Sequence, residues 1–140
     1  MVERLEFSQA IDLFARWDAK VQSEIMQIVS TNRQQEIYRV LTPKIISAII
    51  EHYDIEKTRE ILLNLDEDRQ RHTFYRFRLD MQESLFPDLP DTMQVLILNG
   101  IEPVHAIKLL NTVPKDVNES LMRKVDEDQA AGIRMAALMG

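Results

Sequence analysis

The sequence predicts an all-α fold in which short antiparallel helices stack as an α-solenoid. Three observations support this prediction: apolar residues recur with a period of twelve, most periods open with a residue that favours a helix start, and glycine and alternating β-branched residues are scarce. Such internal periods are typical of repeat architectures, in which each short unit buries its apolar face against its neighbours. At 140 residues, with 45% hydrophobic and 29% charged residues, the chain is long enough for one continuous core.

Counted from Glu6, the period gives ten full units and a longer last unit that starts at Asp126. Three places in each unit carry the pattern and are expected to face the core. The eighth place holds Leu13, Ile25, Ile37, Ile49, Ile61, Thr73, Leu85, Ile97, Leu109, Leu121 and Ile133. The ninth holds Phe14, Met26, Tyr38, Ile50, Leu62, Phe74, Phe86, Leu98, Leu110, Met122 and Arg134. The twelfth holds Trp17, Val29, Leu41, Tyr53, Leu65, Phe77, Leu89, Ile101, Val113, Val125 and Ala137. We expect Thr73, the one polar residue at the eighth place, to return its hydroxyl to the carbonyl one turn back.

A single long helix does not explain this pattern, because twelve residues at about 100° each leave the apolar stripe about 120° out of phase. The first residues of the units instead favour a new helix each time. Residues whose side chains cap helix N-termini are Asp18, Ser30, Thr42, Asp54, Asp66 and Asp126. Prolines near unit starts, where a missing N–H costs little, are Pro43, Pro90, Pro103 and Pro114. Each unit is therefore predicted to be a helix of about eight or nine residues followed by a tight turn.

The units are regular over residues 18–77 and less so afterwards. Pro87 occupies an interior place and is expected to end its helix early. Gly100 suits a left-handed C-cap. We expect one α-solenoid domain, residues 1–140, with a kink near residues 86–91.

Composition and motifs exclude several functional classes. The chain has no cysteine, so disulfides, thiolate metal sites and cysteine nucleophiles are absent. Its three histidines, His52, His72 and His105, have no metal-ligand spacing, and no glycine-rich loop precedes a helix. We therefore expect no enzyme and no cofactor. The net charge of −6 disfavours nucleic acid as the principal partner. The acidic start MVERLEF lacks signal-peptide character and no apolar run could span a bilayer, so we expect a cytoplasmic protein without membrane insertion.

Two acidic triplets open units of the pattern: Asp66, Glu67 and Asp68, and then Asp126, Glu127 and Asp128. Acids in a first helical turn are stabilised by the helix dipole whatever the protein does. The functional alternative is a weak site for a hard cation such as Mg²⁺, which needs several oxygen ligands. Neither triplet has the spacing of an EF-hand loop.

The stretch RQRHTFYRFR, residues 69–78, is the most basic part of the chain. Basic and aromatic residues alternate on single-strand nucleic-acid platforms. Phe74 and Phe77, however, occupy core places of the period and are not expected to stack on bases. Arg69, Arg71 and Arg76 then form a surface suited to intramolecular ion pairs or to an acidic protein partner.

The last unit, DEDQAAGIRMAALMG, carries more apolar residues than one face can bury. Met135, Leu138 and Met139 lie at other angles of the helix than Ile133 and Ala137. Either the chain end folds back over the last groove or frays, or this face docks a partner helix or a second copy of the chain.

The segments EIYRVLTPKIISAIIEHYDIEKTREILLNLDEDRQRH and EPVHAIKLLNTVPKDVNESLMRKVDEDQA resemble the N-terminal intracellular domain of MgtE-type magnesium transporters. The superhelical domains of the flagellar motor switch protein FliG are similar in pattern. The usual His-Pro unit opening is replaced here by Thr42-Pro43 and Glu102-Pro103, and the EHPQ-type motif of FliG is missing. The resemblance implies a right-handed, armadillo-like superhelix of about ten to eleven short antiparallel helices. In the transporters, acids of this domain help sense magnesium at an interface with a second domain.

Two functions remain open. The first is a non-catalytic scaffold or adaptor that binds another protein, or a second copy, through its solenoid surface, because a solenoid offers an extended face without an obligatory pocket. The second, implied by the resemblance, is a stand-alone regulatory domain that senses magnesium weakly.

Overall fold

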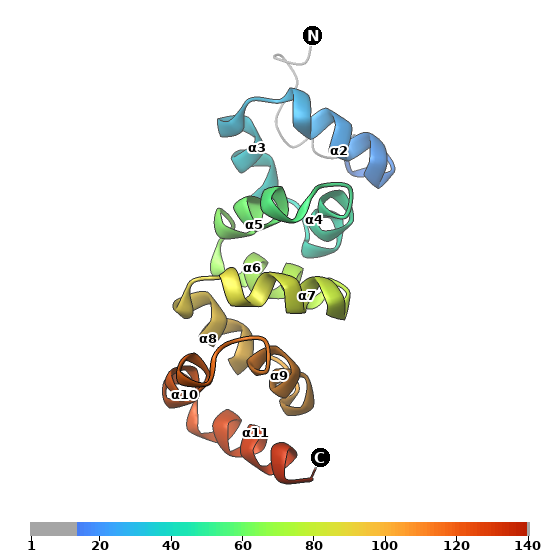
Figure 1. Ribbon diagram of the computed structural model, residues 1–140. Coiled ribbons are helices and arrows are strands. Elements are labelled where there is room, and N and C mark those ends of the chain that lie inside the picture. The colour runs from blue at the N-terminus through green and yellow to red at the C-terminus, as the bar shows by residue number, and fades with distance from the viewer. Residues whose placement is uncertain (1–13, 140) are drawn as a thin grey trace. The chain divides into compact units, whose positions relative to one another are not determined.

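The computed structural model describes residues 14–139, which form ten α-helices, one short 3₁₀-helix and no strand. The all-α prediction is confirmed for this range. The elements are α2 (Ala19–Ile28), α3 (Thr31–Tyr38), α4 (Pro43–Ile50), α5 (Ile55–Leu63), α6 (Glu67–Tyr75), α7 (Leu79–Leu85), η2 (Phe86–Asp88), α8 (Asp91–Asn99), α9 (Pro103–Leu110), α10 (Lys115–Lys124) and α11 (Glu127–Met139) (Figure 1). None of these helices has the length and hydropathy needed to cross a bilayer.

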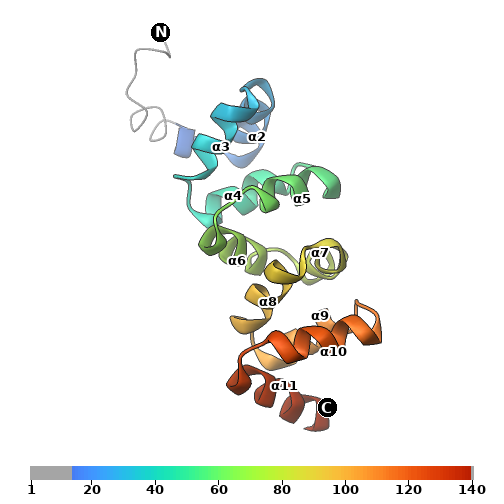
Figure 2. The same ribbon diagram turned by 90° about the vertical axis from the view of Figure 1, so that its left-hand side faces the viewer.

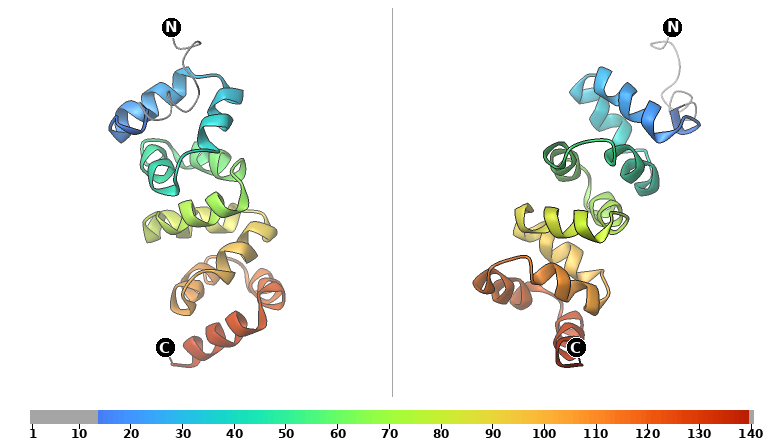
Figure 3. Two further views of the ribbon diagram at one scale, coloured as in Figure 1. Left: turned by 180° about the vertical axis from the view of Figure 1, so that it is seen from behind. Right: turned by 45° about the vertical axis from the view of Figure 1, so that its right-hand side comes forward.

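The chain divides into two compact units, Met1–Arg69 and Gln70–Gly140. In the first unit α2 packs against α4 (Figure 2). The Tyr53 hydroxyl donates a 2.9 Å hydrogen bond to the Ser23 carbonyl of α2. In the second unit α7 packs against α9, α8 against α10, and α9 against α11 (Figure 3). Within each unit, therefore, a helix contacts the next helix but one, as expected when short helices fold back on each other.

Helix starts follow the predicted cap residues in the first unit. The Asp18 carboxylate accepts from the Val21 amide at 2.9 Å, and the Asp54 carboxylate accepts from the Lys57 amide at 2.8 Å. Ser30, Thr42 and Asp66 make the same bond, to the amide three residues on, at 3.4, 3.4 and 3.3 Å. The prolines also lie at helix starts: Pro43 and Pro103 begin α4 and α9, and Pro90 and Pro114 precede α8 and α10.

Pro87 ends its helix early, as predicted, since α7 stops at Leu85 and the chain continues as η2. The expectation for Gly100 is wrong, because its φ is −113° and it is not left-handed. This position needs glycine for another reason: a Cβ there would collide with the Tyr75 hydroxyl. That hydroxyl donates a 2.7 Å hydrogen bond to the Ile97 carbonyl in the last turns of α8.

The predicted core places are buried through most of the described chain, with Ile49, Leu62 and Phe74 fully enclosed. Leu13 lies outside the described residues. The columns fail at the chain's first and last described turns, since Trp17 is 46% exposed and the side chains of Arg134 and Ala137 are exposed. The expectation for Thr73 is also wrong: the residue is fully buried, but its hydroxyl has no hydrogen-bond partner among the described residues.

A further column, at the fifth place of the period, joins consecutive helices through side-chain amides. Each amide donates to the carbonyl eight residues earlier, in the last turn before the chain reverses. The bonds run from Gln22 to Phe14 (2.9 Å), Gln34 to Met26 (2.6 Å), Gln82 to Phe74 (3.1 Å), Gln94 to Phe86 (2.7 Å) and Asn118 to Leu110 (3.2 Å). All of these carbonyls except that of Met26 also accept from the backbone amide three residues on, so there the side-chain amide adds a second donor at the end of a helix.

Gln34 and Gln82 also donate to the carbonyl five residues earlier, and where the fifth place is aliphatic a later helix supplies this bond. Ile46 replaces the amide in α4, and Arg69 Nε donates to the Leu41 carbonyl at 3.0 Å. Ala106 replaces it in α9, and Gln129 Nε2 donates to the Leu98 and Ile101 carbonyls, both at 2.6 Å. Arg69 and Gln129 occupy the same place of their units, sixty positions apart. The two compact units therefore repeat the same solution to the same missing bond.

Candidate partner-binding groove

A hollow in the second unit is formed by α9, α10 and α11. It has a volume of about 440 Å³, within the range of ligand-binding clefts. Its apolar lining includes Leu110, Met122, Ile133 and Ala137, and its charged lining includes Glu119, Arg123 and Arg134. We call this hollow the α9–α11 groove.

The groove arises because the residues at the ninth place of the period are no longer buried in α10 and α11, although Leu121 and Ile133 at the eighth place still are. At the ninth place every described residue from Phe14 to Leu110 is buried, whereas Met122 is half-buried and Arg134 is exposed. The residues one sixty-residue step earlier than Arg134 and Ala137 are Phe74 and Phe77, which are buried in aromatic contact with each other. Exchange of two large rings for a solvated guanidinium and a methyl group leaves apolar surface uncovered.

The two arginines of the groove form no ion pairs with other side chains of the described range. Arg123 and Arg134 make no ion pair with any residue in the range 14–139. The neighbouring Lys124, by contrast, pairs with Asp91 at 2.8 Å, and this pairing lowers the pKa of the Asp91 carboxyl. Glu119 is the carboxylate of the lining and precedes Arg123 by one turn of α10. Two arginines against one glutamate give the groove a positive balance in a chain of net charge −6.

The predicted arginine surface is only partly available for a partner. Arg69 is used by the first unit, because its guanidinium bonds the Leu41 carbonyl and pairs with Asp66 at 3.1 Å. Arg71 is half-buried, with its charge close enough to Tyr75 to oppose the effect of burial on the Tyr75 pKa. Arg76 is exposed after the end of α6. That these three arginines form a binding surface stays a prediction.

The apolar residues predicted at the C-terminal helix are exposed but lie outside the groove. Met135, Leu138 and Met139 are 61%, 85% and 82% exposed on α11, while Ile133 and Ala137 of the same helix line the groove. The six acids of the two triplets are exposed at the starts of α6 and α11. Within residues 14–139, no three His, Asp or Glu side chains gather in a way that could hold a metal ion.

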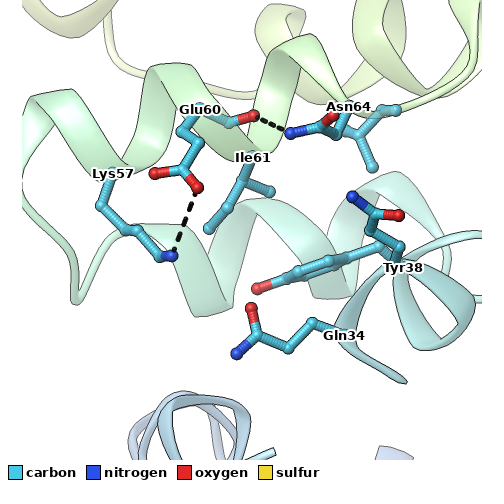
Figure 4. A pocket seen from close by; sticks show the side chains of 8 residues that line it. Gln34, Tyr38, Lys57, Glu60, Ile61 and Asn64 are labelled. Atoms are coloured by element: carbon cyan, nitrogen blue, oxygen red, sulfur yellow. Dashed lines mark hydrogen bonds and ion pairs between the residues drawn. The ribbon is translucent and has the colours of Figure 1, made fainter. Parts of the chain in front are cut away.

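A smaller hollow of about 30 Å³ lies in the first unit between α3 and α5 (Figure 4). Most residues that line it have polar groups: the Lys57 ammonium lies 3.8 Å from the Glu60 carboxylate, and the Asn64 amide donates to the Glu60 carbonyl at 2.9 Å. Tyr38 reaches into it with a hydroxyl that has no hydrogen-bond partner among the described residues. Burial, and then the neighbouring Tyr53, raise the Tyr38 pKa far above its usual value. The space is too small for anything beyond a water-sized molecule.

Sequence reasoning missed the groove and the amide column. The sequence shows that Arg134 interrupts the apolar column at the ninth place. Together with Met122, the flexible residue before it in that column, this interruption marks the edge of an uncovered surface. The amides were visible too, since Gln22, Gln34, Gln82 and Gln94 recur at one place. They went unnoticed because a search for apolar columns ignores a polar residue that is buried by bonding a carbonyl.

Comparison with known proteins gives one family. The family model described as the MgtE intracellular N domain matches residues 41–137, which include α9, α10 and all but the last two residues of α11. The resemblance inferred from the residue pattern is thereby confirmed. No curated protein matches the chain.

Proposed function

The chain belongs to the MgtE intracellular N domain family, and from this premise we propose that it is a non-catalytic regulatory module that binds another protein through the α9–α11 groove. The observation that supports the proposal is the groove itself. It combines accessible apolar surface at the half-buried Met122 and the exposed Ala137 with two arginines that make no ion pair within residues 14–139. Apolar surface rimmed by charge is characteristic of protein-binding sites.

The test places a photo-crosslinking amino acid at Met122 in the full chain, expressed in its native cells. We expect a discrete adduct with a partner protein that disappears when Ala137→Glu, at an exposed position of the groove lining, is added. The control carries the crosslinker at Asn32, which is exposed on α3 in the first unit. Adducts that are equally abundant at both positions, or that survive Ala137→Glu, would contradict binding at the groove.

Magnesium sensing is the second candidate, favoured by family membership and by the exposed acids at the starts of α6 and α11. Titration of the full chain with Mg²⁺, followed by NMR, tests it. Saturable shifts at millimolar Mg²⁺, centred on Asp126 and Asp128 and lost in Asp126→Asn with Asp128→Asn, are the expected signature. Shifts that are linear in concentration and spread over all surface acids would argue against a sensor.

Three further parts of the proposal follow from the period and the family. We place the protein in the cytoplasm, because the matched domain is described as intracellular. We propose that the helices wind as a right-handed superhelix, as the resemblance to the MgtE N domain implies. The FliG-like pattern is consistent with that winding.

A further inference from the structure

We propose that the α9–α11 groove accepts an amphipathic helix of a partner protein whose apolar face is flanked by carboxylates. This inference rests on the proposed function and specifies the chemistry of the partner. Three properties of the groove support it: the packing of the helices that form it, the charges at its edge, and its contrast with equivalent places in the chain.

The packing favours a helical occupant. In the second unit, α8 lies against α10 and α9 against α11, so each of these pairs is separated by one helix in the chain. A helix that repeated this relation would lie on α10 and α11, where Met122 and Ile133 line the groove. Helix-in-groove recognition works through apolar residues spaced by three or four positions, which reach such a floor from one face.

The charges favour an acidic occupant. Arg123 and Arg134 are exposed, line the groove and make no ion pair in the range 14–139. Guanidinium groups bind carboxylates through paired hydrogen bonds, so glutamate or aspartate beside the apolar stripe of the occupant would complete them. Lysine at the same positions would face two like charges, with only Glu119 to offset them.

The repeat shows what these two places hold when no groove is present. Sixty positions before Arg134 and Ala137 stand Phe74 and Phe77, with 0% and 6% of their surfaces exposed. The change from Phe to Arg and from Phe to Ala opens space and adds a positive charge at the same site. A groove with free space beside apolar residues and with added positive charge is suited to a partner that supplies apolar side chains and carboxylates.

The test uses two synthetic helical peptides of about 15 residues, long enough to form helix when bound. Both carry leucines on one face; one has glutamates flanking that face, and the other has lysines at the same positions. Binding to the full chain is measured by fluorescence anisotropy, and the site is located by NMR of the Met122 methyl group. We expect the glutamate peptide to bind about tenfold more tightly, the gain of two exposed ion pairs.

Charge reversal gives the decisive comparison. Arg123→Glu with Arg134→Glu should reverse the preference in favour of the lysine peptide. The matched control, Arg16→Glu with Arg39→Glu, changes the same number of charges on exposed residues of the first unit and should leave the preference unchanged. Far-UV circular dichroism confirms that both variants are folded.

Several results would overturn the inference. The first is equal affinity for the two peptides, and the second is an unchanged NMR signal of the Met122 methyl group. The third is a preference for the glutamate peptide that survives Arg123→Glu with Arg134→Glu. The fourth is a dimer, seen by light scattering, whose interface covers the groove. If the Met122 crosslink still captures a partner, an equal-affinity result rejects the acidic helix alone and leaves protein binding intact. If neither peptide nor partner engages Met122, the proposed function fails as well.

Discussion

The two units secure their helices in different ways. In the first unit, helix starts are capped locally by the side chains of Asp18, Ser30, Thr42, Asp54 and Asp66. In the second, the N-cap residues of α7, α8, α9 and α10 make no side-chain cap bond; they are Arg78, Pro90, Glu102 and Pro114.

The second unit instead gathers long-range bonds around the end of α8. Tyr75 donates to the Ile97 carbonyl, Gln129 donates to two further carbonyls, and the Asp126 amide donates to the Asn99 side chain at 2.9 Å. The comparison teaches that, within one repeat pattern, the backbone groups at helix ends can be bonded either by side chains close in sequence or by residues about thirty positions away. The first solution depends on the local residue type, and the second depends on the packed fold.

The largest expected effect distinguishes the filled core of the first unit from the groove of the second. Leu62 and Met122 occupy the same place of the period, but Leu62 is fully buried and Met122 is half-buried. Leu62→Ala should lower the free energy of unfolding by about 2–5 kcal/mol, whereas Met122→Ala should cost less than about 1 kcal/mol. Urea unfolding measures both. Equal losses would mean that the groove is packed as tightly as the core.

The next effect tests the amide column that both units share. Gln82→Met keeps the size of the side chain but removes the side-chain donor of the Phe77 carbonyl and leaves the Phe74 carbonyl with only the Phe77 amide. We expect a loss of about 1–3 kcal/mol in the free energy of unfolding, the usual cost of a buried unpaired polar group. Gln27→Met, at an exposed position of α2, is the control and should change stability by less than about 0.5 kcal/mol. A neutral Gln82→Met would show that the column is dispensable.

A smaller change in stability should distinguish a helix start with a side-chain cap from one without. Asp54→Ala removes the bond to the Lys57 amide and should cost about 1 kcal/mol. Glu102→Ala, at the uncapped start of α9, should leave thermal stability nearly unchanged. If both substitutions gave the same melting temperature, the distinction between the two units would not hold.

The smallest effect appears only in alkali and concerns the bond between Tyr75 and Ile97. Burial raises the Tyr75 pKa to about 12 from 10.0, although Arg71 and the Gly100 backbone act in the opposite direction. Because the unfolded chain releases this proton first, the stabilisation is complete below pH 10 and is lost as the pH rises towards about 12. Tyr75→Phe should flatten this part of the stability profile, measured by urea unfolding at a series of pH values. A slope identical to that of the wild type would assign the loss to Tyr38 and Tyr53, whose pKa values burial also raises.

The sequence predicted the helices well because their signals are local. Asp54 caps the helix that follows it, Pro87 stops the helix that precedes it, and Leu62 is buried where the period places it. Expectations for single residues failed where a distant partner determines the result. Gly100 is required by the Tyr75 hydroxyl, and the Thr73 hydroxyl does not make the bond expected of it.

The sequence by itself therefore determined the helical class, the twelve-residue spacing and the residues at which helices begin. These properties depend on side-chain type and on contacts within one or two turns. Only the tertiary structure decided which carbonyls Arg69 and Gln129 bond, and that α9, α10 and α11 leave a groove at Met122 and Arg134. A side chain can be assigned to a face from its spacing, but whether another helix covers that face depends on how separate helices pack in space.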